Sequence, residues 1–194
     1  MKKNGGVYVI SASSGTGKDT VCRCLTERYQ NLVIAPSVTT RKRRADDNQL
    51  CGKIYTFVSE QEFEEMIKED VFLEYDRFSE HYYGTQKKEV LGLIENGCKV
   101  IMILDVDGGL EIKEKFPESV LIFLKAPSIE TLEERLINRG SDKQEEIEKR
   151  LKQVDYEYAM SNHYDYRITN YNLEETVQEA AKIIFGENES EYLK

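Results

Sequence analysis

The most constraining feature of this chain is a glycine-rich segment close to its start. Residues 12–19 read A-S-S-G-T-G-K-D, between a short β-prone run, V-Y-V-I, and a helical pattern that begins at Lys18. Gly15 and Gly17 allow the backbone to turn, so that its N–H groups and the helix N-terminus face an anion. Lys18 adds a positive charge at the same place. The segment predicts a phosphate-binding loop rather than an ordinary surface turn between a strand and a helix.

The loop departs at two positions from the pattern G-x-x-x-x-G-K-[ST], with Ala12 for the first glycine and Asp19 for the hydroxyl residue. A carboxylate at Asp19 either contacts Mg²⁺ or its waters, or is a first-turn charge that favours the helix N-terminus. Both interpretations stay open, and Thr20 follows with a hydroxyl. The predicted nucleotide-binding residues are Ala12, Ser13, Ser14, Gly15, Thr16, Gly17, Lys18, Asp19 and Thr20.

Two apolar runs further along the chain predict a parallel sheet. Residues 99–104 (KVIMIL) and 120–124 (VLIFL) are almost continuously apolar, which is typical of strands buried on both faces. Helices are expected between and after them, and strand–helix alternation indicates an α/β fold. The expected helix starts and stops are Ser59 with Glu62, Asn172 with Glu175, Asp142 with Glu145, Ser128, and Gly140 as a stop.

Composition excludes several classes of protein. The 194 residues are 40% hydrophobic, but no run approaches the roughly 18 apolar residues of a membrane-spanning helix. No secretory signal is visible, and the cysteine and histidine spacing fits no zinc site, so a cytoplasmic protein with free thiols is expected. Lys+Arg 27 against Asp+Glu 36 gives a net charge of −9, which argues against a nucleic-acid binder.

The segment from about residue 37 to 84 has a different pattern. Short β-prone runs at 55–58, 71–74 and 82–84 flank a helix that starts after Ser59. This pattern predicts a small mixed lobe inserted into the order of the main sheet. The last residues, from Gly186, are polar and are expected to fray.

Several motifs in order resemble the guanylate kinases, a family of nucleoside monophosphate kinases. They are S-S-G-T-G-K-D-T, S-V-T-T-R-K-R-R, Y-T-F-V-S, F-L-E-Y, Y-Y-G-T, I-L-D-V-D and R-L-I-N-R-G, with K-R-L downstream. The resemblance implies a parallel sheet of the P-loop NTPase type flanked by helices, with a GMP-binding lobe and a helical lid. It also implies the reaction ATP + GMP ⇌ ADP + GDP with Mg²⁺. The implied division is a domain at 4–185 (core 4–36 and 86–185, lobe about 37–85, lid about 135–155) and a polar tail at 186–194.

The densest positive cluster of this acidic chain, R-K-R-R at 41–44, is assigned to the acceptor by the resemblance. Arg41 and Arg44 match the arginines that bind the GMP phosphate, and the planar guanidinium suits that group. Tyr55 and Tyr83 match phenols that donate to the same phosphate. The alternative for the basic cluster is a solvated patch or a localisation signal. The alternative for the two tyrosines is an ordinary place in the core.

Ser37, Glu74 and Thr85 match the positions that contact guanine in the family. Guanine presents two donors, N1–H and the N2 amino group, and one carboxylate accepts from both. Adenine has an acceptor at N1 and would leave Glu74 badly paired. The alternative for Glu74 is a solvated surface glutamate.

Lys18, Arg135, Arg139 and Arg150 are the predicted catalytic residues. Arg135 and Arg139 are four apart and so share a helix face, and all three arginines match the family's lid arginines. A surface salt bridge is the alternative, although no acidic residue stands three or four positions from Arg135.

Asp105 follows the apolar run at 99–104, and a carboxylate at that end of a parallel strand faces the ligand crevice. It either serves Mg²⁺ or orients the acceptor, and the sequence does not choose between these roles. The family usually has Asp-x-Gln-Gly here, whereas this chain has Asp107 in place of the glutamine, and the 45–54 loop also departs. The predicted metal residues are Asp19, Thr20 and Asp105.

Two other functions remain open from the sequence. One is a kinase of the same fold for a phosphorylated sugar of the ribose bisphosphate type, and Glu74, Tyr83 and Thr85 favour GMP over it. The other is a non-catalytic, peptide-binding scaffold, which the presence of Lys18 and the lid arginines opposes. The expected partners are GMP and ATP, with no nucleic acid and no membrane, and the oligomeric state is left open.

Overall fold

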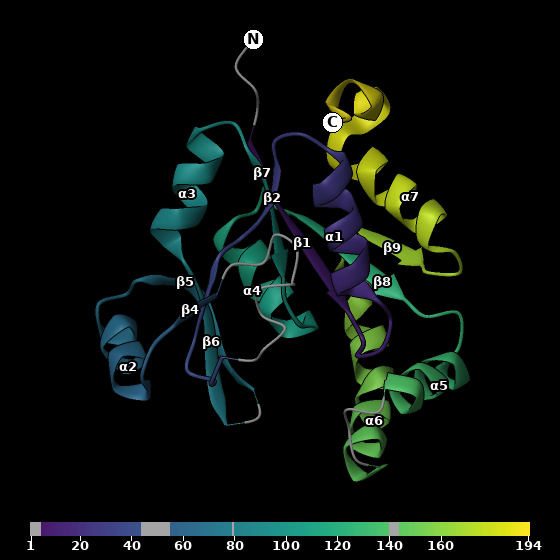
Figure 1. The fold of residues 1–194 in the computed structure, drawn as a ribbon, viewed down its shortest axis with the longest axis horizontal. Helices are drawn as coiled ribbons and strands as arrows, with labels where there is room; N and C mark the ends of the chain where they lie inside the picture. Colours follow the sequence, from purple (N-terminus) through teal and green to yellow (C-terminus); the bar gives the residue numbers. More distant parts are fainter. Residues whose placement is uncertain (1–4, 44–54, 79, 140–143) are drawn as a thin grey trace.

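The computed structural model describes residues 5–43, 55–78, 80–139 and 144–194 (Figure 1). Its centre is a five-stranded sheet in the order β2-β7-β1-β8-β9, and every neighbouring pair in it is parallel. The strands are β1 (Gly6–Ala12), β2 (Leu32–Ile34), β7 (Lys99–Ile103), β8 (Val120–Lys125) and β9 (Tyr166–Thr169). The two strands expected from apolar runs are confirmed as β7 and β8, and the sequence pattern did not predict β9.

Helices cover both faces of this sheet, as the side chains of β1 show, because they alternate between two buried clusters. Tyr8 and Ile10 belong to one buried cluster, with residues of α1 and α7, whereas Val7 and Val9 belong to another, with residues of α3 and α4. Both faces of the sheet are therefore buried. Strands that are buried on both faces need almost continuous apolar runs, as β7 and β8 have. The parallel sheet flanked by helices is the fold class that the sequence predicts.

The helix starts agree with the sequence wherever the structure describes them. Ser59 forms a reciprocal capping box with Glu62, the Asn172 side chain accepts from two backbone N–H groups, and Ser128 Oγ accepts from Thr131 N. The expected cap at Asp142 and the stop at Gly140 lie outside the described residues. The helices described are α1 (Lys18–Arg28), α2 (Glu60–Lys68), α3 (Lys87–Glu95), α4 (Val106–Lys115), α5 (Ile129–Arg139), α6 (Gln144–Met160) and α7 (Leu173–Phe185). None of them is long and apolar enough to span a bilayer.

A second, four-stranded sheet lies beside the first and has the order β4-β3-β6-β5. It is mixed, as expected for the inserted lobe, because β3 pairs with β4 in parallel and with β6 antiparallel. Helix α2 covers one face, where Phe63 stacks between Phe72 and Tyr82. Gly84 has to be glycine because a Cβ there would lie 2.8 Å from the Phe72 ring. The strands are β3 (Ser37–Thr39), β4 (Tyr55–Phe57), β5 (Phe72–Phe78) and β6 (His81–Gln86).

The C-terminal tail differs from the expectation that it frays. Residues Gly186–Tyr192 form a 3₁₀ helix, η2, and Leu193 makes a β-bridge with Tyr29. The Tyr192 ring lies 4.7 Å from that of Phe185, which in turn stacks on Tyr29 at 5.1 Å. The polar composition of the tail gave no indication of these aromatic contacts. Through them the tail packs against the end of α1.

Candidate functional site

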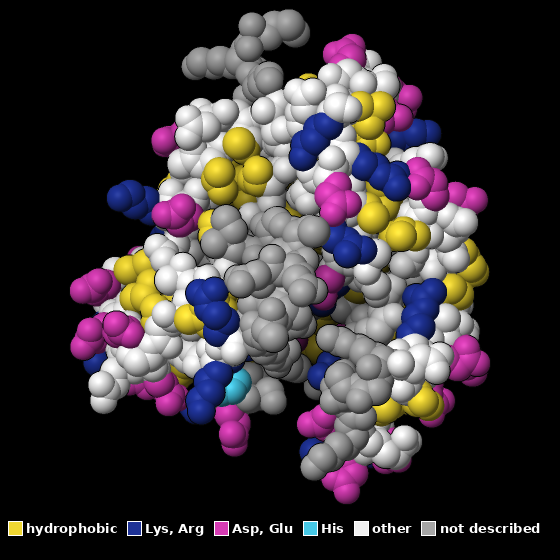
Figure 2. Space-filling view, in the orientation of Figure 1, with side chains coloured by type: hydrophobic (Ala, Val, Ile, Leu, Met, Phe, Trp, Pro, Cys, Tyr) yellow, Lys and Arg dark blue, Asp and Glu magenta, His cyan; other side chains and the backbone are white. Residues whose placement is uncertain are grey.

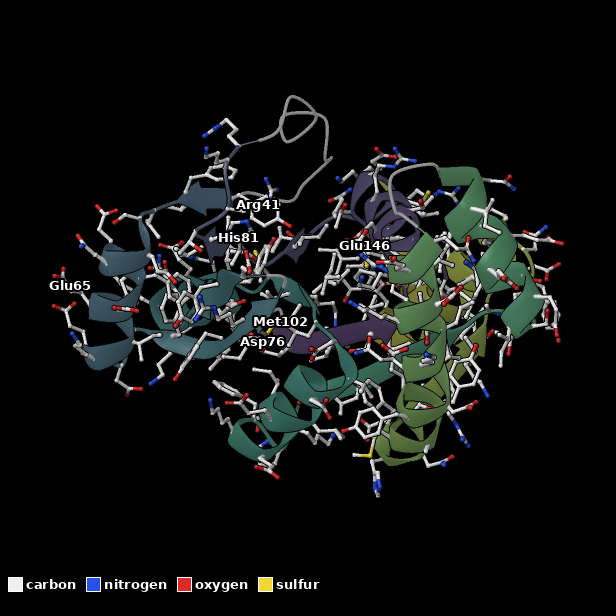
Figure 3. All side chains as sticks on the ribbon, turned by 90° about the horizontal axis from the view of Figure 1, so that it is seen from below. Arg41, Glu65, Asp76, His81, Met102 and Glu146 are labelled. Atoms are coloured by element: carbon white, nitrogen blue, oxygen red, sulfur yellow. The ribbon has the colours of Figure 1, made fainter. Side chains whose placement is uncertain are left out.

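A cavity of about 850 Å³ lies between the two sheets and helix α6. In Figure 2 a notch opens at the lower edge of the molecule, between the half with α2 and the half with α5 and α6. Figure 3 looks from that side and shows Asp76 on β5 and Arg41 just after β3, with Glu146 of α6 across from them. The predicted residues that line this cavity are Ala12, Ser14, Lys18, Asp19, Ser37, Tyr55, Glu74, Tyr83, Thr85, Asp105 and Arg150.

The glycine loop joins β1 to α1 in the geometry that its sequence predicts. Gly15 and Gly17 have φ values of 89° and 96°, a left-handed conformation that glycine adopts without strain. Thr16 N donates to Ser13 O at 3.1 Å, which closes the turn before Lys18 begins α1. The loop therefore directs a helix N-terminus and one lysine towards the cavity, the arrangement that binds phosphate.

Two arginines of the predicted lid contact this loop. Arg135, on α5, donates from Nη1 to the Thr16 carbonyl at 3.2 Å, and Arg150, on α6, donates from Nη1 to Ser14 Oγ at 2.6 Å. The contact of Arg135 is thus a hydrogen bond to a loop carbonyl and not a surface salt bridge. Both guanidinium groups therefore lie against the loop, and Arg150 also lines the cavity.

The Thr16 carbonyl has a second donor that the sequence did not reveal. Asn170, which follows β9 and is 7% exposed, donates from Nδ2 to Thr16 O at 2.8 Å. The Thr176 hydroxyl fixes the orientation of this amide by donating to Asn170 Oδ1 at 3.0 Å. The loop is thus fastened to the strand and helix at the far end of the chain.

The cavity face of the second sheet is organised in a cross-strand row. Strand register places Ser37 opposite Tyr55 on one side and opposite Thr85 on the other, and Thr85 opposite Glu74. All four side chains line the cavity. Residues far apart in the sequence thereby form one continuous polar surface, and three of them are the predicted guanine contacts.

An irregularity in β5 turns Glu74 towards this surface. Phe72 pairs with Gln86 and Glu74 with Thr85, so two steps on β5 match one step on β6. A bulge of this kind reverses the alternation of side chains along the strand. Phe72 consequently packs against α2, whereas Glu74 faces the cavity, although a regular strand would place both on one face.

The Glu74 carboxyl is 6% exposed and accepts a 2.6 Å hydrogen bond from Thr85 Oγ1. Burial raises its pKa from 4.5 to about 7, and the bond from Thr85 only partly opposes the rise. The solvated-surface interpretation of Glu74 is wrong. A buried carboxyl with one oxygen occupied is suited to accept hydrogen bonds from a ligand in the cavity.

Arg41 packs against the Tyr55 ring and is not among the residues that line the cavity. It is 6% exposed, and its guanidinium carbon is 4.8 Å from the centre of the Tyr55 ring and 5.3 Å from that of Phe57. Nη1 donates to the Lys42 carbonyl at 3.0 Å. Arg41 is therefore not an ordinary solvated surface arginine, and its charge lies close to the Tyr55 phenol.

Asp105 lies at the carboxyl end of β7, as its position after the apolar run predicts, and its side chain caps helix α4. Its Oδ1 accepts from Gly108 N at 2.8 Å. Burial raises the pKa of the Asp105 carboxyl, and the bond from Gly108 opposes that rise. The carboxylate lines the cavity across from the second sheet.

Some predicted residues cannot be placed in the cavity. Arg44 and the 45–54 loop lie outside the described residues, as does the side chain of Arg139, whose backbone ends α5. Thr20 lies in the first turn of α1 but is not among the residues that line the cavity.

Several acidic side chains of the cavity were missed by sequence reasoning. Glu157 is on α6, seven positions after Arg150, and burial raises its pKa despite the nearby Ser13 hydroxyl and Lys18. The seven-residue spacing, two helical turns, was a signal that could have found it. The lining also contains three polar residues that the sequence did not single out, Asp76, Glu111 and Gln153. Asp107, which stands in place of the family's glutamine, lines the cavity as well and accepts a 2.7 Å hydrogen bond from Tyr156 of α6.

Comparison with known proteins agrees with this geometry. The family model for guanylate kinase matches residues 4–187. The guanylate kinase of Caldanaerobacter subterraneus subsp. tengcongensis is 42% identical over 100% of this chain and 96% of its own, and that of Prochlorococcus marinus subsp. pastoris is 42% identical over 95% and 99%. The crystal structure of guanylate kinase from Anaplasma phagocytophilum superposes with a TM-score of 0.75 at 28% identity, over 100% of this chain and 89% of that one. This chain belongs to the guanylate kinase family.

Proposed function

We propose that this chain transfers the γ-phosphoryl group of ATP to GMP or dGMP, giving ADP and GDP or dGDP. The observation that carries the proposal is the buried Glu74 carboxyl, which shares one cavity with Lys18 of the glycine loop. A carboxylate that accepts from two donors distinguishes guanine from adenine, and a loop lysine binds phosphate oxygens. One end of the cavity is thus suited to the acceptor base and the other to the donor phosphates.

The acceptor side is proposed to use the second sheet. Ser37, Glu74 and Thr85 would contact the base from a single cross-strand row, together with Asp105 from the opposite wall. Tyr55 and Tyr83 would donate to the GMP phosphate, with Arg41 and Arg44 supplying charge.

The donor side needs charge neutralisation more than acid–base chemistry. The acceptor is a phosphate oxygen with a second pKa of about 6, so it is already largely ionised at neutral pH. Lys18 and Arg150, with Arg135 and Arg139, would hold the phosphates in line and reduce the repulsion between the two anions. The contacts of Arg135 and Arg150 with the loop support this role.

Mg²⁺ is the metal that this chemistry implies, and the residues fit it. Asp19 and Asp105 both line the cavity, although the described residues contain no group of three metal-ligating side chains. Mg²⁺ usually binds one or two carboxylates together with waters and substrate phosphates, so no dedicated cage is needed. Asp19, Thr20 and Asp105 would hold it, and it would supply positive charge to the phosphate oxygens.

We further propose that the chain has three parts with separate functions. They are the core at 4–36 and 86–185, the GMP-binding lobe at about 37–85 and the lid at about 135–155. The lid would exclude water when it closes, because ATP would otherwise be hydrolysed. The polar tail at 186–194 lies outside this division. A cytoplasmic location, where both nucleotides are present, stays a prediction.

A coupled assay for ADP release tests the proposal. The full chain is given ATP and Mg²⁺ with GMP, dGMP, AMP or a ribose bisphosphate in parallel. Among these acceptors, only GMP and dGMP are expected to give rapid ADP release. Release with the sugar phosphate alone would identify a sugar kinase, and no release with any acceptor would indicate a non-catalytic member of the family.

A further inference from the structure

One buried hydroxyl contacts the backbone next to Asp105, a residue of the cavity wall. Tyr164 follows the short 3₁₀ helix after α6 and is 7% exposed. Its hydroxyl lies 2.8 Å from Ser11 Oγ and 3.1 Å from the Val106 carbonyl oxygen, and it donates to one of these at a time. Ser11, at the end of β1, in turn donates to the Asp105 carbonyl at 2.9 Å. Ser11 thus holds the carbonyl of the Asp105–Val106 peptide, and Tyr164 contacts both Ser11 and the carbonyl of the next peptide.

The surroundings of Tyr164 are adapted to this contact. Its ring packs edge-on against Phe123, with the centroids 5.6 Å apart, so the hydroxyl has a fixed position. Gly109, in the first turns of α4, leaves room for it, because a Cβ there would collide with the Tyr164 hydroxyl. The start of α4 therefore approaches Tyr164 as closely as only glycine allows.

The Asp105 backbone carries the carboxylate that lines the cavity. Its carbonyl accepts from Ser11 Oγ and from Gly109 N, while its side chain accepts from Gly108 N. A shift of this peptide would move the carboxylate together with the first turn of α4. Small displacements of a positioning group are costly in an enzyme, since the reacting groups have to be held closely.

We propose that Tyr164 is a positioning residue for the acceptor: its hydroxyl, through Ser11 and the Val106 carbonyl, fixes Asp105 in the wall of the cavity that GMP occupies. The inference rests on the proposed function. It predicts an effect on GMP and not on ATP, because the glycine loop is held separately, through the bonds that Asn170 and Arg135 donate to Thr16.

The test compares two tyrosines that contact the same phenylalanine. Tyr164→Phe removes the hydroxyl and keeps the ring. Tyr158→Phe is the matched control, because the Tyr158 ring also meets Phe123 edge-on, whereas the hydrogen bonds to Ser11 and to the Val106 carbonyl come from Tyr164. Ser11→Ala is a second variant, which removes the link to the Asp105 carbonyl without touching the aromatic packing.

KM for GMP, KM for ATP, kcat and the thermal midpoint are measured for each variant. Tyr164→Phe is expected to raise KM for GMP about three- to tenfold, the range for one lost hydrogen bond, with KM for ATP changed by less than about twofold. Ser11→Ala is expected to change KM for GMP in the same direction, and Tyr158→Phe to leave it unchanged. Equal changes in both KM values, or equal effects of the two tyrosine variants, would overturn the positioning role. If Tyr164→Phe fails to fold, the comparison of KM for GMP with KM for ATP in Ser11→Ala tests the positioning role instead.

GMP binding without turnover, measured by titration calorimetry, separates this inference from the function on which it rests. A wild-type chain that binds no GMP overturns the proposed function itself. A wild type that binds GMP, with a Tyr164→Phe variant that binds it equally well, overturns only the role of Tyr164. Weaker binding by the variant supports it.

Discussion

Thr85 Oγ1 donates a 2.6 Å hydrogen bond to Glu74 Oε1 across the β5–β6 pair. The bond occupies one carboxylate oxygen and fixes the plane of the group, and the other oxygen remains available to a ligand. The two residues are eleven positions apart, and the bulge in β5 determines that they meet on the cavity face.

Replacing Glu74 by Gln is expected to reduce selectivity for guanine. The amide keeps an oxygen for Thr85 but presents N–H groups to the two donors of the base. The loss in kcat/KM for GMP is expected to be about 1.5–3 kcal/mol, as for a hydrogen bond to a charged group. Steady-state kinetics with GMP and AMP measure it, and Glu64→Gln, an exposed change on α2, is the control. Equal losses for GMP and AMP would contradict the assignment.

Glu74 is also expected to make the stability of the ligand-free protein depend on pH. Its folded pKa of about 7 lies above the ordinary 4.5, so the folded state binds this proton more tightly than the unfolded state. The stabilisation is complete below about pH 4.5 and is lost as the pH rises through about 7. The unfolding free energy of the wild type should therefore fall over this window, relative to that of Glu74→Gln, by on the order of 3 kcal/mol. Denaturant unfolding of both proteins at several pH values measures this, and parallel curves would contradict it.

Lys18→Ala is expected to reduce kcat more than tenfold, a deficit above about 1.4 kcal/mol, while the fold remains intact. Lys18 follows the glycine loop and lines the cavity, where its charge is available to the phosphates. Lys182→Ala, an exposed change on α7, should retain full activity. A Lys18→Ala protein with more than about a tenth of the wild-type kcat would remove Lys18 from the phosphate site.

Asp19 is expected to alter the Mg²⁺ dependence of the rate. It is exposed, lies in the first turn of α1 and lines the cavity beside Lys18. Asp19→Ser should remain active with a shifted Mg²⁺ requirement, and Asp19→Ala should require more Mg²⁺, because a hard oxygen ligand is lost. Adding Thr20→Ala should increase the requirement further. If the Mg²⁺ titrations of all the variants superimpose on that of the wild type, Asp19 is a helix-terminal charge only.

The C-terminal tail is expected to stabilise the fold without affecting catalysis. Tyr192→Ala removes the ring that meets Phe185, and the unfolding free energy should fall by about 1–2 kcal/mol. Figure 1 shows the C-terminus at the end of the molecule opposite α5 and α6, so kcat should not change. Glu187→Ala, an exposed change in the same tail, is the control. Equal stability of the two variants in denaturant unfolding would mean that the docked tail contributes nothing.

Features that depend on neighbouring residues could be predicted from the sequence alone. The glycine loop could be predicted because its turn, its lysine and the following helix lie within a few positions, and backbone hydrogen bonds there are local. The capping box of Ser59 and Glu62 spans three positions and was equally visible. The buried strands β7 and β8 followed from continuous apolar runs. Together with the ordered motifs, these features indicated the family and the composition of most of the candidate site.

Which distant side chains meet could not be predicted from the sequence, because it depends on how whole elements pack together. The direction of Glu74 depends on a bulge, which inserts one residue without a signal in the alternation of the strand. The bonds of Arg135 and Asn170 to Thr16, and that of Tyr164 to Ser11, join residues more than a hundred positions apart, and the packing of whole elements sets their distances. The docking of the tail on Tyr29 is of the same kind. Local hydrogen bonding and periodicity are written in short stretches of sequence, whereas long-range contacts depend on strand register and on the fit of side chains in the folded chain.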